Sequence, residues 1–372
     1  MRVLMAAPFE AKGRYKGGIS SVVNNMLLHK SALDECNLEI IKFNTCAVKR
    51  AAGSDASFNK ENIKNALYLY NTITDSIKEN NPDILYYHSS VRYALLKDLL
   101  ILRNAKINTK IKTVIHIHFA DYEKIMTGNS LIDKLILSIL KKYVDVIVFL
   151  SKTTMNSFVK HGIDRKKCTV IYNFNTLTLK ESDISISNQN EDKTIRLLFV
   201  GTIGKRKGFF DLVKALERVD KNKYELHVCG EATDEESIEL FEKCKNEMKK
   251  NLVFHGFVSG EKRDYIYKNA DIMILPSYGE GLPMVILEAF SAGCAVISTN
   301  VGAIPEILKD ENGTIIEPGN IDALSQAISF YIDNPKILFE IQKNNFQYSS
   351  KFTCEEFIYR VSEACKKGDN SE

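Results

Sequence analysis

Several features that would place this 372-residue sequence in a special class of protein are missing. The eight cysteines are scattered, with no CxxC pair and no histidine cluster at zinc-like spacing beside them, so we expect free thiols in a reducing cytosol. No apolar run approaches the roughly 20 residues that span a bilayer. The short apolar run at 2–8 is broken by Pro8 and Glu10, which indicates a first β-strand rather than a signal peptide. We therefore expect a cytoplasmic protein.

Sequence motifs of two other functional classes are also missing. A dinucleotide-dependent oxidoreductase would carry G-x-G-x-x-G after its first strand, whereas residues 13–18 read GRYKGG. The lysines are not interleaved with aromatic residues, and no DNA- or RNA-binding motif is visible, so we expect no nucleic-acid partner.

The net charge of +3 hides an uneven distribution. Residues 1–180 hold 27 Lys and Arg against 15 Asp and Glu, whereas the remainder holds 23 against 32. A basic half favours an anionic partner, such as a membrane surface or a phosphorylated substrate. A solvated, lysine-rich surface explains the same excess equally well.

Apolar runs alternate with amphipathic stretches along the chain, which predicts parallel sheets covered by helices. The first half holds six candidate strands, at 2–8, 38–44, 84–88, 113–118, 144–151 and 168–173. A second series follows at 194–201, 224–230, 252–258, 271–276, 294–299 and 313–318. Residues 174–192 between them are polar and without periodicity, as expected of a linker.

The length of the chain exceeds the size at which one hydrophobic core keeps growing, and the second series of strands indicates a second domain. We predict an N-terminal domain at 1–175, a linker at 176–192 and a C-terminal domain at 193–345. Residues 346–372 are predicted to form a C-terminal helix that returns to the first domain.

The segment 276–293, PSYGEGLPMVILEAFSAG, joins the end of a strand to a helix that starts near Pro283. Ligands of doubly wound sheets bind beyond the carboxyl ends of the strands, where helix N-termini offer amides to phosphate or hydroxyl oxygens. Glu280 lies in the loop, and Glu288 lies about a turn and a half into the helix. By spacing alone, such a pair is more often found on an ordinary surface.

In its setting, the pair closely resembles the signature of the family-4, or group 1, retaining glycosyltransferases of GT-B fold. Further matches follow in the family's order, at 199–208, 294–299, 301–307, 312–313 and 317–319. The resemblance implies an α/β protein of two Rossmann-like domains whose parallel sheets face a deep interdomain cleft. It implies that Glu280 contacts the donor sugar and that Glu288 accepts hydrogen bonds from the ribose hydroxyls. The other residues that it places at the donor in this segment are Gly281, Leu282, Pro283 and Met284.

A basic loop follows the first strand of the second series. Lys205, Arg206 and Lys207 put cations beside a helix start, which suits a diphosphate that leaves with extra negative charge. In the family, an arginine directly after the first glycine and a lysine before the later glycine hold this diphosphate. Lys207 matches the lysine, but Thr202 stands at the arginine position, and Arg206 is a candidate to supply the missing charge.

The first domain offers two weaker elements. Gly17 and Gly18 resemble the family's loop that faces the donor diphosphate and the acceptor. His116 and His118 alternate along a strand and so point to the same side. The resemblance implies that His118 contacts the transferring sugar and that Asp121 assists on the acceptor side, whereas His116 is expected to be structural.

The resemblance implies a transferase that moves a sugar, with retention, from a nucleotide-diphosphate sugar, UDP-linked by expectation, to a hydroxyl of a glycan or lipid-linked acceptor. No cofactor or metal is expected, in agreement with the lack of a DxD motif. His118, Lys207 and Glu280 are the predicted catalytic residues. The default setting is bacterial surface-polysaccharide biosynthesis, with a peripheral contact of the basic first half with the inner face of an anionic membrane.

Two other functions stay open. A GT-B-fold sugar-nucleotide epimerase would need no acceptor, and the Glu280–Glu288 signature argues against it. A non-catalytic nucleotide-sugar-binding subunit would have the same fold, and its only support is Thr202.

Overall fold

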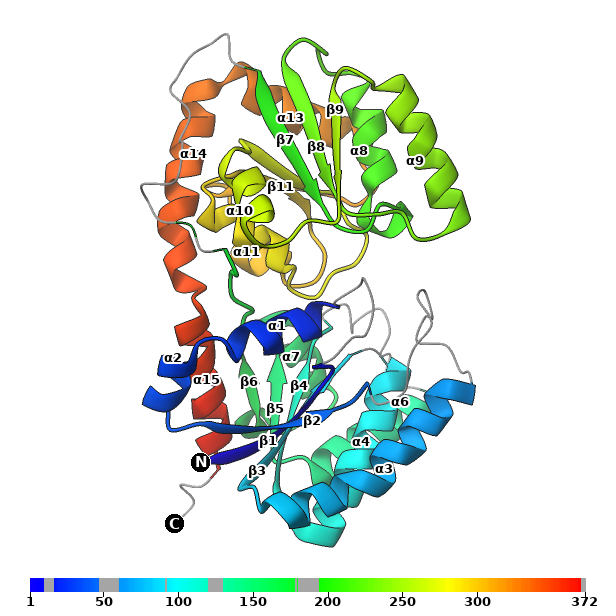
Figure 1. Ribbon diagram of the computed structural model, residues 1–372, viewed down its shortest axis with the longest axis vertical. Coiled ribbons are helices and arrows are strands. Elements are labelled where there is room, and N and C mark those ends of the chain that lie inside the picture. Colours follow the sequence, from blue (N-terminus) through cyan, green and yellow to red (C-terminus); the bar gives the residue numbers. More distant parts are fainter. Residues whose placement is uncertain are drawn as a thin grey trace. The chain divides into compact units, whose positions relative to one another are not determined.

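The computed structural model describes residues 1–9, 17–46, 60–90, 92–119, 130–177, 179 and 194–368. The chain divides into two compact units, of which the first comprises Met1–Phe174 with Cys354–Glu372 and the second comprises Asn175–Thr353. In the described residues, each unit is built on one parallel sheet of six strands that is covered by helices (Figure 1). Both sheets are of the Rossmann-like α/β class that the sequence predicts.

The first sheet has the strand order β2-β1-β3-β4-β5-β6. Its strands are β1 (Arg2–Ala7), β2 (Glu39–Asn44), β3 (Ile84–Ser89), β4 (Lys112–Ile117), β5 (Val146–Phe149) and β6 (Cys168–Val170). The helices of this unit are α1 (Gly18–Met26), α2 (Lys30–Glu35), α3 (Lys60–Asn80), α4 (Arg92–Thr109), α6 (Leu131–Tyr143), α7 (Lys152–Lys160) and α15 (Cys354–Lys366), with a 3-10 turn at Arg165–Lys167.

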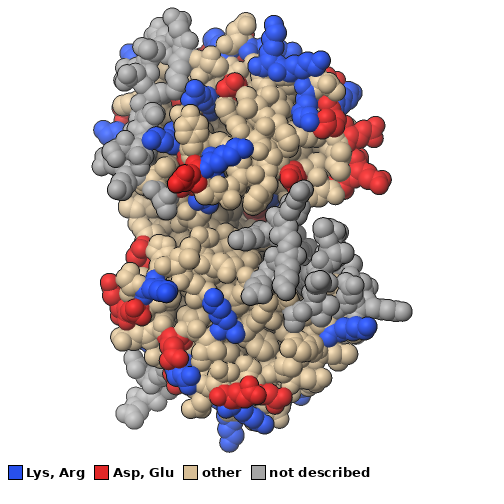
Figure 2. All heavy atoms as spheres, in the orientation of Figure 1, with Lys and Arg blue, Asp and Glu red and all other residues tan. Residues whose placement is uncertain are grey.

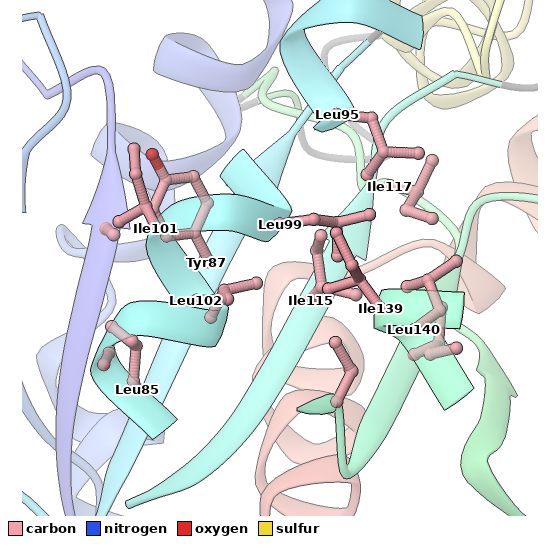
Figure 3. Close-up of a cluster of buried hydrophobic side chains, with 14 of the residues drawn as sticks. Leu85, Tyr87, Leu95, Leu99, Ile101, Leu102, Ile115, Ile117, Ile139 and Leu140 are labelled. Carbon is pink, nitrogen blue, oxygen red and sulfur yellow. The ribbon is translucent and has the colours of Figure 1, made fainter. Parts of the chain in front are cut away.

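The core of the first unit lies between this sheet and the helices α3, α4 and α6. Leu95, Leu99 and Leu102 of α4 recur at helical spacing and are fully buried. Figure 3 shows these leucines beside side chains of β3, β4 and α6, among them Ile115 and Leu140. Burying one such leucine side chain stabilises the fold by about 1.5–3 kcal/mol.

The second sheet has the strand order β12-β11-β10-β7-β8-β9. Its strands are β7 (Ile195–Val200), β8 (Tyr224–Cys229), β9 (Leu252–Gly256), β10 (Ile272–Leu275), β11 (Ala295–Thr299) and β12 (Gly313–Ile316). The helices are α8 (Phe209–Leu216), α9 (Glu235–Glu247), α10 (Gly260–Lys268), α11 (Met284–Ser291), α12 (Ile304–Ile307), α13 (Ile321–Asp333) and α14 (Pro335–Tyr348), with 3-10 turns at Lys205–Lys207 and Ser349–Lys351.

All twelve strands predicted from the sequence are present, and most end one or two residues inside the predicted runs. The predicted runs are longer than the strands because buried apolar residues of the adjoining loops continue the apolar pattern of the strand. In the described residues, no helix is long and apolar enough to cross a membrane.

The end of the chain divides between the units after Thr353, eight residues beyond the predicted boundary at 345. Tyr348 explains the difference, because its ring packs against Phe290 of α11 at 5.6 Å between centroids and so belongs to the second unit. Phe357 of α15 packs against Phe174 of the first unit, at 4.9 Å. Of the predicted linker, residues 178 and 180–192 lie outside the described residues.

Candidate functional site

In the second sheet, the connections reverse direction between β7 and β10. These two strands are neighbours, β8 and β9 continue on one side of them, and β11 and β12 lie on the other. The loops that follow β7 and β10 therefore start side by side at the carboxyl edge of the sheet, where doubly wound sheets bind ligands. One loop carries the basic residues 205–207, and the other carries Glu280.

Gly208 allows the two loops to approach each other. Its φ of +68° is in the left-handed region, and a Cβ at this position would lie 2.0 Å from the carbonyl oxygen of Pro276. Only glycine meets both conditions. The turn at Lys205–Lys207 therefore lies against the end of β10, where the Tyr278 amide donates to the carbonyl of Arg206 at 2.9 Å.

Lys207 and Glu280 form an ion pair at this point. Lys207 Nζ lies 2.6 Å from Glu280 Oε1, and their side chains are 15% and 8% exposed. Charges this deeply buried are little screened by salt. The pair brings together a cation that suits a phosphate oxygen and a carboxylate that suits hydroxyl groups.

The other two cations of the basic loop have different partners. Lys205 pairs with Glu236 at 2.6 Å on the surface. Arg206 donates from its guanidinium to the carbonyl of Gly279 at 3.0 Å. Arg206 thus supports the backbone directly before Glu280, whereas Lys207 contacts the Glu280 carboxylate itself.

A loop after β11 supports the other side of Glu280. Gly302 has a φ of +59°, and a Cβ there would lie 2.3 Å from the carbonyl oxygen of Glu280. The Ala303 amide donates to the carbonyl of Gly281 at 2.9 Å. The segment VGAIPEI at 301–307 therefore packs against the backbone that carries Glu280 and holds it in place.

Glu288, on α11, is 5% exposed, and both its carboxylate oxygens accept hydrogen bonds. Oε1 accepts from the Thr176 hydroxyl at 2.5 Å and from the Arg263 guanidinium at 3.2 Å. Oε2 accepts from the Tyr267 hydroxyl at 2.9 Å. Burial and the nearby Glu288 raise the pKa of Tyr267 well above its usual value, so this hydroxyl stays a donor.

The three partners of Glu288 were not predicted from the sequence. They lie between 21 and 112 residues from Glu288 along the chain, so no local motif joins them to it. The only local cue in the sequence is that Arg263 and Asp264 are adjacent residues of opposite charge. In the structure, the Arg263 guanidinium donates to the Asp264 carboxylate.

Helix α11 starts one residue later than the sequence predicts. Pro283 has an extended ψ of 119° and caps the helix, and Met284 is the first helical residue. The fixed φ of proline suits either position, so the sequence alone does not separate them. Leu282 is 4% exposed, whereas Gly281 and Met284 are partly exposed beside it.

In the first unit, three histidines lie together at the carboxyl ends of β3 and β4. His88 Nδ1 lies 2.7 Å from His118 Nε2. The rings of His116 and His118 stack with 4.1 Å between their centroids, as expected for side chains on one side of a strand. His118 follows the last residue of β4, and its amide still donates to the carbonyl of Ser89 at 2.9 Å.

The three imidazoles are neutral near pH 7. Burial lowers the pKa of His118 to about 3. It also lowers the pKa of His88 and of His116 well below the usual value, and the neighbouring histidines add to the effect. Neutral imidazoles suit the contact with an uncharged sugar that the resemblance implies for His118.

Among the described residues, these histidines are also the one group that brings three possible metal ligands within 4.8 Å of one another. Tetrahedral zinc sites hold their nitrogens about 3.4 Å apart. The distance of 2.7 Å between His88 and His118 is shorter and is that of a hydrogen bond. The arrangement therefore fits a hydrogen-bonded pair better than a metal site.

The remaining predicted residues of the first unit are Gly17, Gly18 and Asp121. Gly17 precedes α1 and Gly18 begins it, and a Cβ on either would meet nothing within 4 Å among the described residues. Packing within the described chain therefore does not require these glycines. Asp121 lies outside the described residues.

Two family models match the chain. The model described as "Glycosyl transferases group 1" matches residues 180–348, and the model described as "Glycosyltransferase Family 4" matches residues 46–176. An uncharacterized 41.2 kDa protein in the cps region of Klebsiella pneumoniae is 27% identical over 361 residues, which cover 93% of this chain and 97% of the relative. The O-antigen chain mannosyltransferase B of Escherichia coli is 30% identical over 135 residues, 35% of each chain.

Solved structures share the fold over nearly the whole chain. HepE of Anabaena, in complex with UDP-glucose, matches with a TM-score of 0.71 at 16% identity and covers 98% of each chain. Sucrose-phosphate synthase of Thermosynechococcus elongatus matches with a TM-score of 0.77 at 15% identity and covers 100% of each chain. At such identities, the match concerns the fold, which is that of the GT-B glycosyltransferases.

Proposed function

Because the chain belongs to the family-4, group 1 glycosyltransferases, we propose that it transfers a sugar, with retention, from a UDP-sugar to a hydroxyl of a glycan or lipid-linked acceptor. The observation that carries the proposal is the buried ion pair of Lys207 and Glu280 at the reversal point of the second sheet. A neighbour of the same fold that binds UDP-glucose supports UDP as the first nucleotide to test.

We assign the two charges of this pair to the two halves of the donor. In the proposed complex, Lys207 moves its ammonium group from Glu280 to a phosphate oxygen, and the carboxylate of Glu280 accepts hydrogen bonds from sugar hydroxyls. We assign Gly281, Leu282, Pro283 and Met284 to the same site, and Arg206 bonds to the carbonyl of Gly279 in the loop before them. A charge-assisted bond of this kind contributes about 1.5–3 kcal/mol.

The ribose goes to Glu288 in this proposal. Its two hydroxyls replace the Thr176 hydroxyl and the Arg263 guanidinium at Oε1, while the bond from Tyr267 to Oε2 keeps the carboxylate in place. The exchange conserves the number of hydrogen bonds that Glu288 accepts, so its buried carboxylate is not left unpaired.

The proposed reaction needs few protein groups. The acceptor oxygen attacks the anomeric carbon on the face from which the diphosphate departs, and the carbon–oxygen bond to the phosphate breaks. The leaving phosphate oxygen takes the electron pair of that bond and the proton of the acceptor hydroxyl. Lys207 stabilises the negative charge that develops on the leaving diphosphate, and His118 contacts the sugar. Because Lys207 supplies this positive charge, the proposed reaction requires no metal.

The acceptor is proposed to belong to a bacterial surface polysaccharide. The relatives in a cps region and in O-antigen assembly support this setting. Product analysis tests the function. Incubation with UDP-sugars and a polyprenyl-diphosphate-linked acceptor should release free UDP and yield a glycosylated acceptor. An epimerised donor without transfer would support the epimerase instead, and binding without turnover would support a non-catalytic subunit.

We further propose that α6 contacts an anionic membrane. Its outer face exposes Leu131 and Leu135, at 84% and 45%, together with Lys134, Lys141 and Lys142. Apolar and basic side chains on one helix face suit the interface of an anionic bilayer. On the face of the molecule shown in Figure 2, basic and acidic groups are mixed.

A vesicle assay tests this contact. The double substitution Leu131→Ser and Leu135→Ser should reduce co-sedimentation with vesicles that contain phosphatidylglycerol at low salt. Ile238→Ser, which removes a half-exposed apolar side chain from α9 of the second unit, serves as the matched control and should leave binding unchanged. The same binding by the double variant and the parent would refute the contact.

A further inference from the structure

His88 and His118 share one hydrogen bond, and its direction decides which nitrogen of His118 remains for a substrate. The bond joins His88 Nδ1 to His118 Nε2, at 2.7 Å. A neutral imidazole has one N–H and one acceptor nitrogen, so either ring can be the donor. His118 is only partly buried, and its other nitrogen, Nδ1, takes part in none of the hydrogen bonds between described residues.

The surroundings of His88 favour one direction. His88 is 4% exposed, and its second nitrogen, Nε2, is buried without a partner among the described residues. If His118 donated, His88 would carry its proton on this Nε2 and leave a buried N–H unpaired. Buried N–H groups without an acceptor are rare because their desolvation is not repaid. If His88 donates from Nδ1, the same Nε2 has only an unpaired lone pair.

We infer that His88 is a positioning residue that donates from Nδ1 to His118 and so holds His118 in the tautomer with its proton on Nδ1. His118 then offers an N–H to an oxygen of its substrate and cannot accept a proton there. The inference rests on the proposed function only in naming the transferred sugar as that substrate. His116 does not share this role, because its Nδ1 bonds with the Tyr86 hydroxyl at 3.1 Å.

Three variants of the full chain test the inference. His88→Phe keeps an aromatic ring beside His118 but removes the donor. His88→Asn places an amide N–H near the position of the histidine Nδ1, so it is the conservative rescue. His116→Phe disturbs the stack on His118, at 4.1 Å, without removing its hydrogen bond and is the matched control. Thermal unfolding shows which variants fold.

The first readout is the ¹⁵N NMR spectrum of histidine-labelled protein, which distinguishes the protonated from the bare ring nitrogen. We expect a protonated Nδ1 on His118 in the parent, in His88→Asn and in His116→Phe. In His88→Phe we expect the signals of mixed or reversed tautomers. A parent with the proton on Nε2 of His118, or an unchanged tautomer in His88→Phe, would overturn the inference, and neither result depends on finding the sugar donor.

The second readout is kinetic. His88→Phe should lower kcat for sugar transfer about tenfold, the size of one lost hydrogen bond, and leave the affinity for UDP unchanged because UDP lacks the transferred sugar. His88→Asn should restore most of kcat. Equal kcat in all three variants and the parent would refute the positioning role. A parent without transfer activity would refute the proposed function instead, while the NMR result would still decide the tautomer.

Discussion

At the scale of single residues, the two neighbouring lysines of the basic loop allow a matched comparison. Lys207→Ala should weaken UDP binding by about 1.5–3 kcal/mol, because it removes a charge-assisted bond and leaves Glu280 buried without its cation. Lys205→Ala removes the same charge two residues away, where its pair with Glu236 is mostly exposed, and should change binding little. Calorimetric titration with UDP measures both. Equal losses would indicate a general effect of charge and no specific role of Lys207.

The histidine cluster should make stability depend on pH. In the folded chain, the pKa of His88, His116 and His118 is lowered, whereas in the unfolded chain each takes up a proton near its usual pKa of about 6.5. Below that pH the unfolded state binds more protons, so the free energy of unfolding falls as the pH drops, and the contribution is fully present only above about pH 6.5. We expect the Tm to decrease between pH 7 and pH 5, and to decrease less steeply in His116→Phe. The same slope in both proteins would contradict this account.

The sequence singled out Lys207, Glu280 and Glu288 because each belongs to a local motif, and their roles at a donor stay predictions. The structure brings Lys207 and Glu280 together as an ion pair. The partners of Glu288 were not predictable, because Thr176 and Arg263 reach Glu288 only after the chain has folded. For the same reason, the sequence indicated His118 but not its bond to His88, which comes from the neighbouring strand.

At the scale of elements, the strands were predictable because strands buried on both faces read as continuous apolar runs. The helix start at Pro283 was placed one residue too early, since proline fits both the cap and the first turn. The pairing of the loops after β7 and β10 follows from the strand order, which no local pattern encodes.

A comparison of two glycines with the same backbone conformation distinguishes the cost of backbone strain from the cost of a steric clash. Gly208 and Gly256 have φ values of +68° and +66°, but a Cβ would meet the Pro276 carbonyl oxygen only at Gly208. Gly256→Ala should cost about 1–2 kcal/mol for the left-handed conformation. Gly208→Ala should cost more and also weaken UDP binding, because the basic loop must move away from β10. Chemical denaturation and UDP titration measure the two effects, and similar losses for both variants would refute the role of Gly208.

At the scale of the whole molecule, the fold and the family follow from matches that span nearly the whole chain. The functional groups that we assign differ between the two units. The second unit holds the groups that we assign to the nucleotide sugar, and the first holds His118 and most of the basic excess. The resemblance is strong in the second unit and looser in the first. That contrast is expected if the first unit recognises an acceptor that differs between relatives.

The most direct test of the central claim is amide hydrogen exchange of the full chain with and without saturating UDP-sugar. A donor held by Lys207, Glu280 and Glu288 should slow exchange in residues 201–208 and 276–291 of the second unit, because bound ligand suppresses local opening. We expect this protection in the parent and, at the same donor concentration, weaker protection of both segments in Lys207→Ala, because that variant binds the donor less tightly. Slower exchange confined to other segments of a chain that binds the donor would contradict this account.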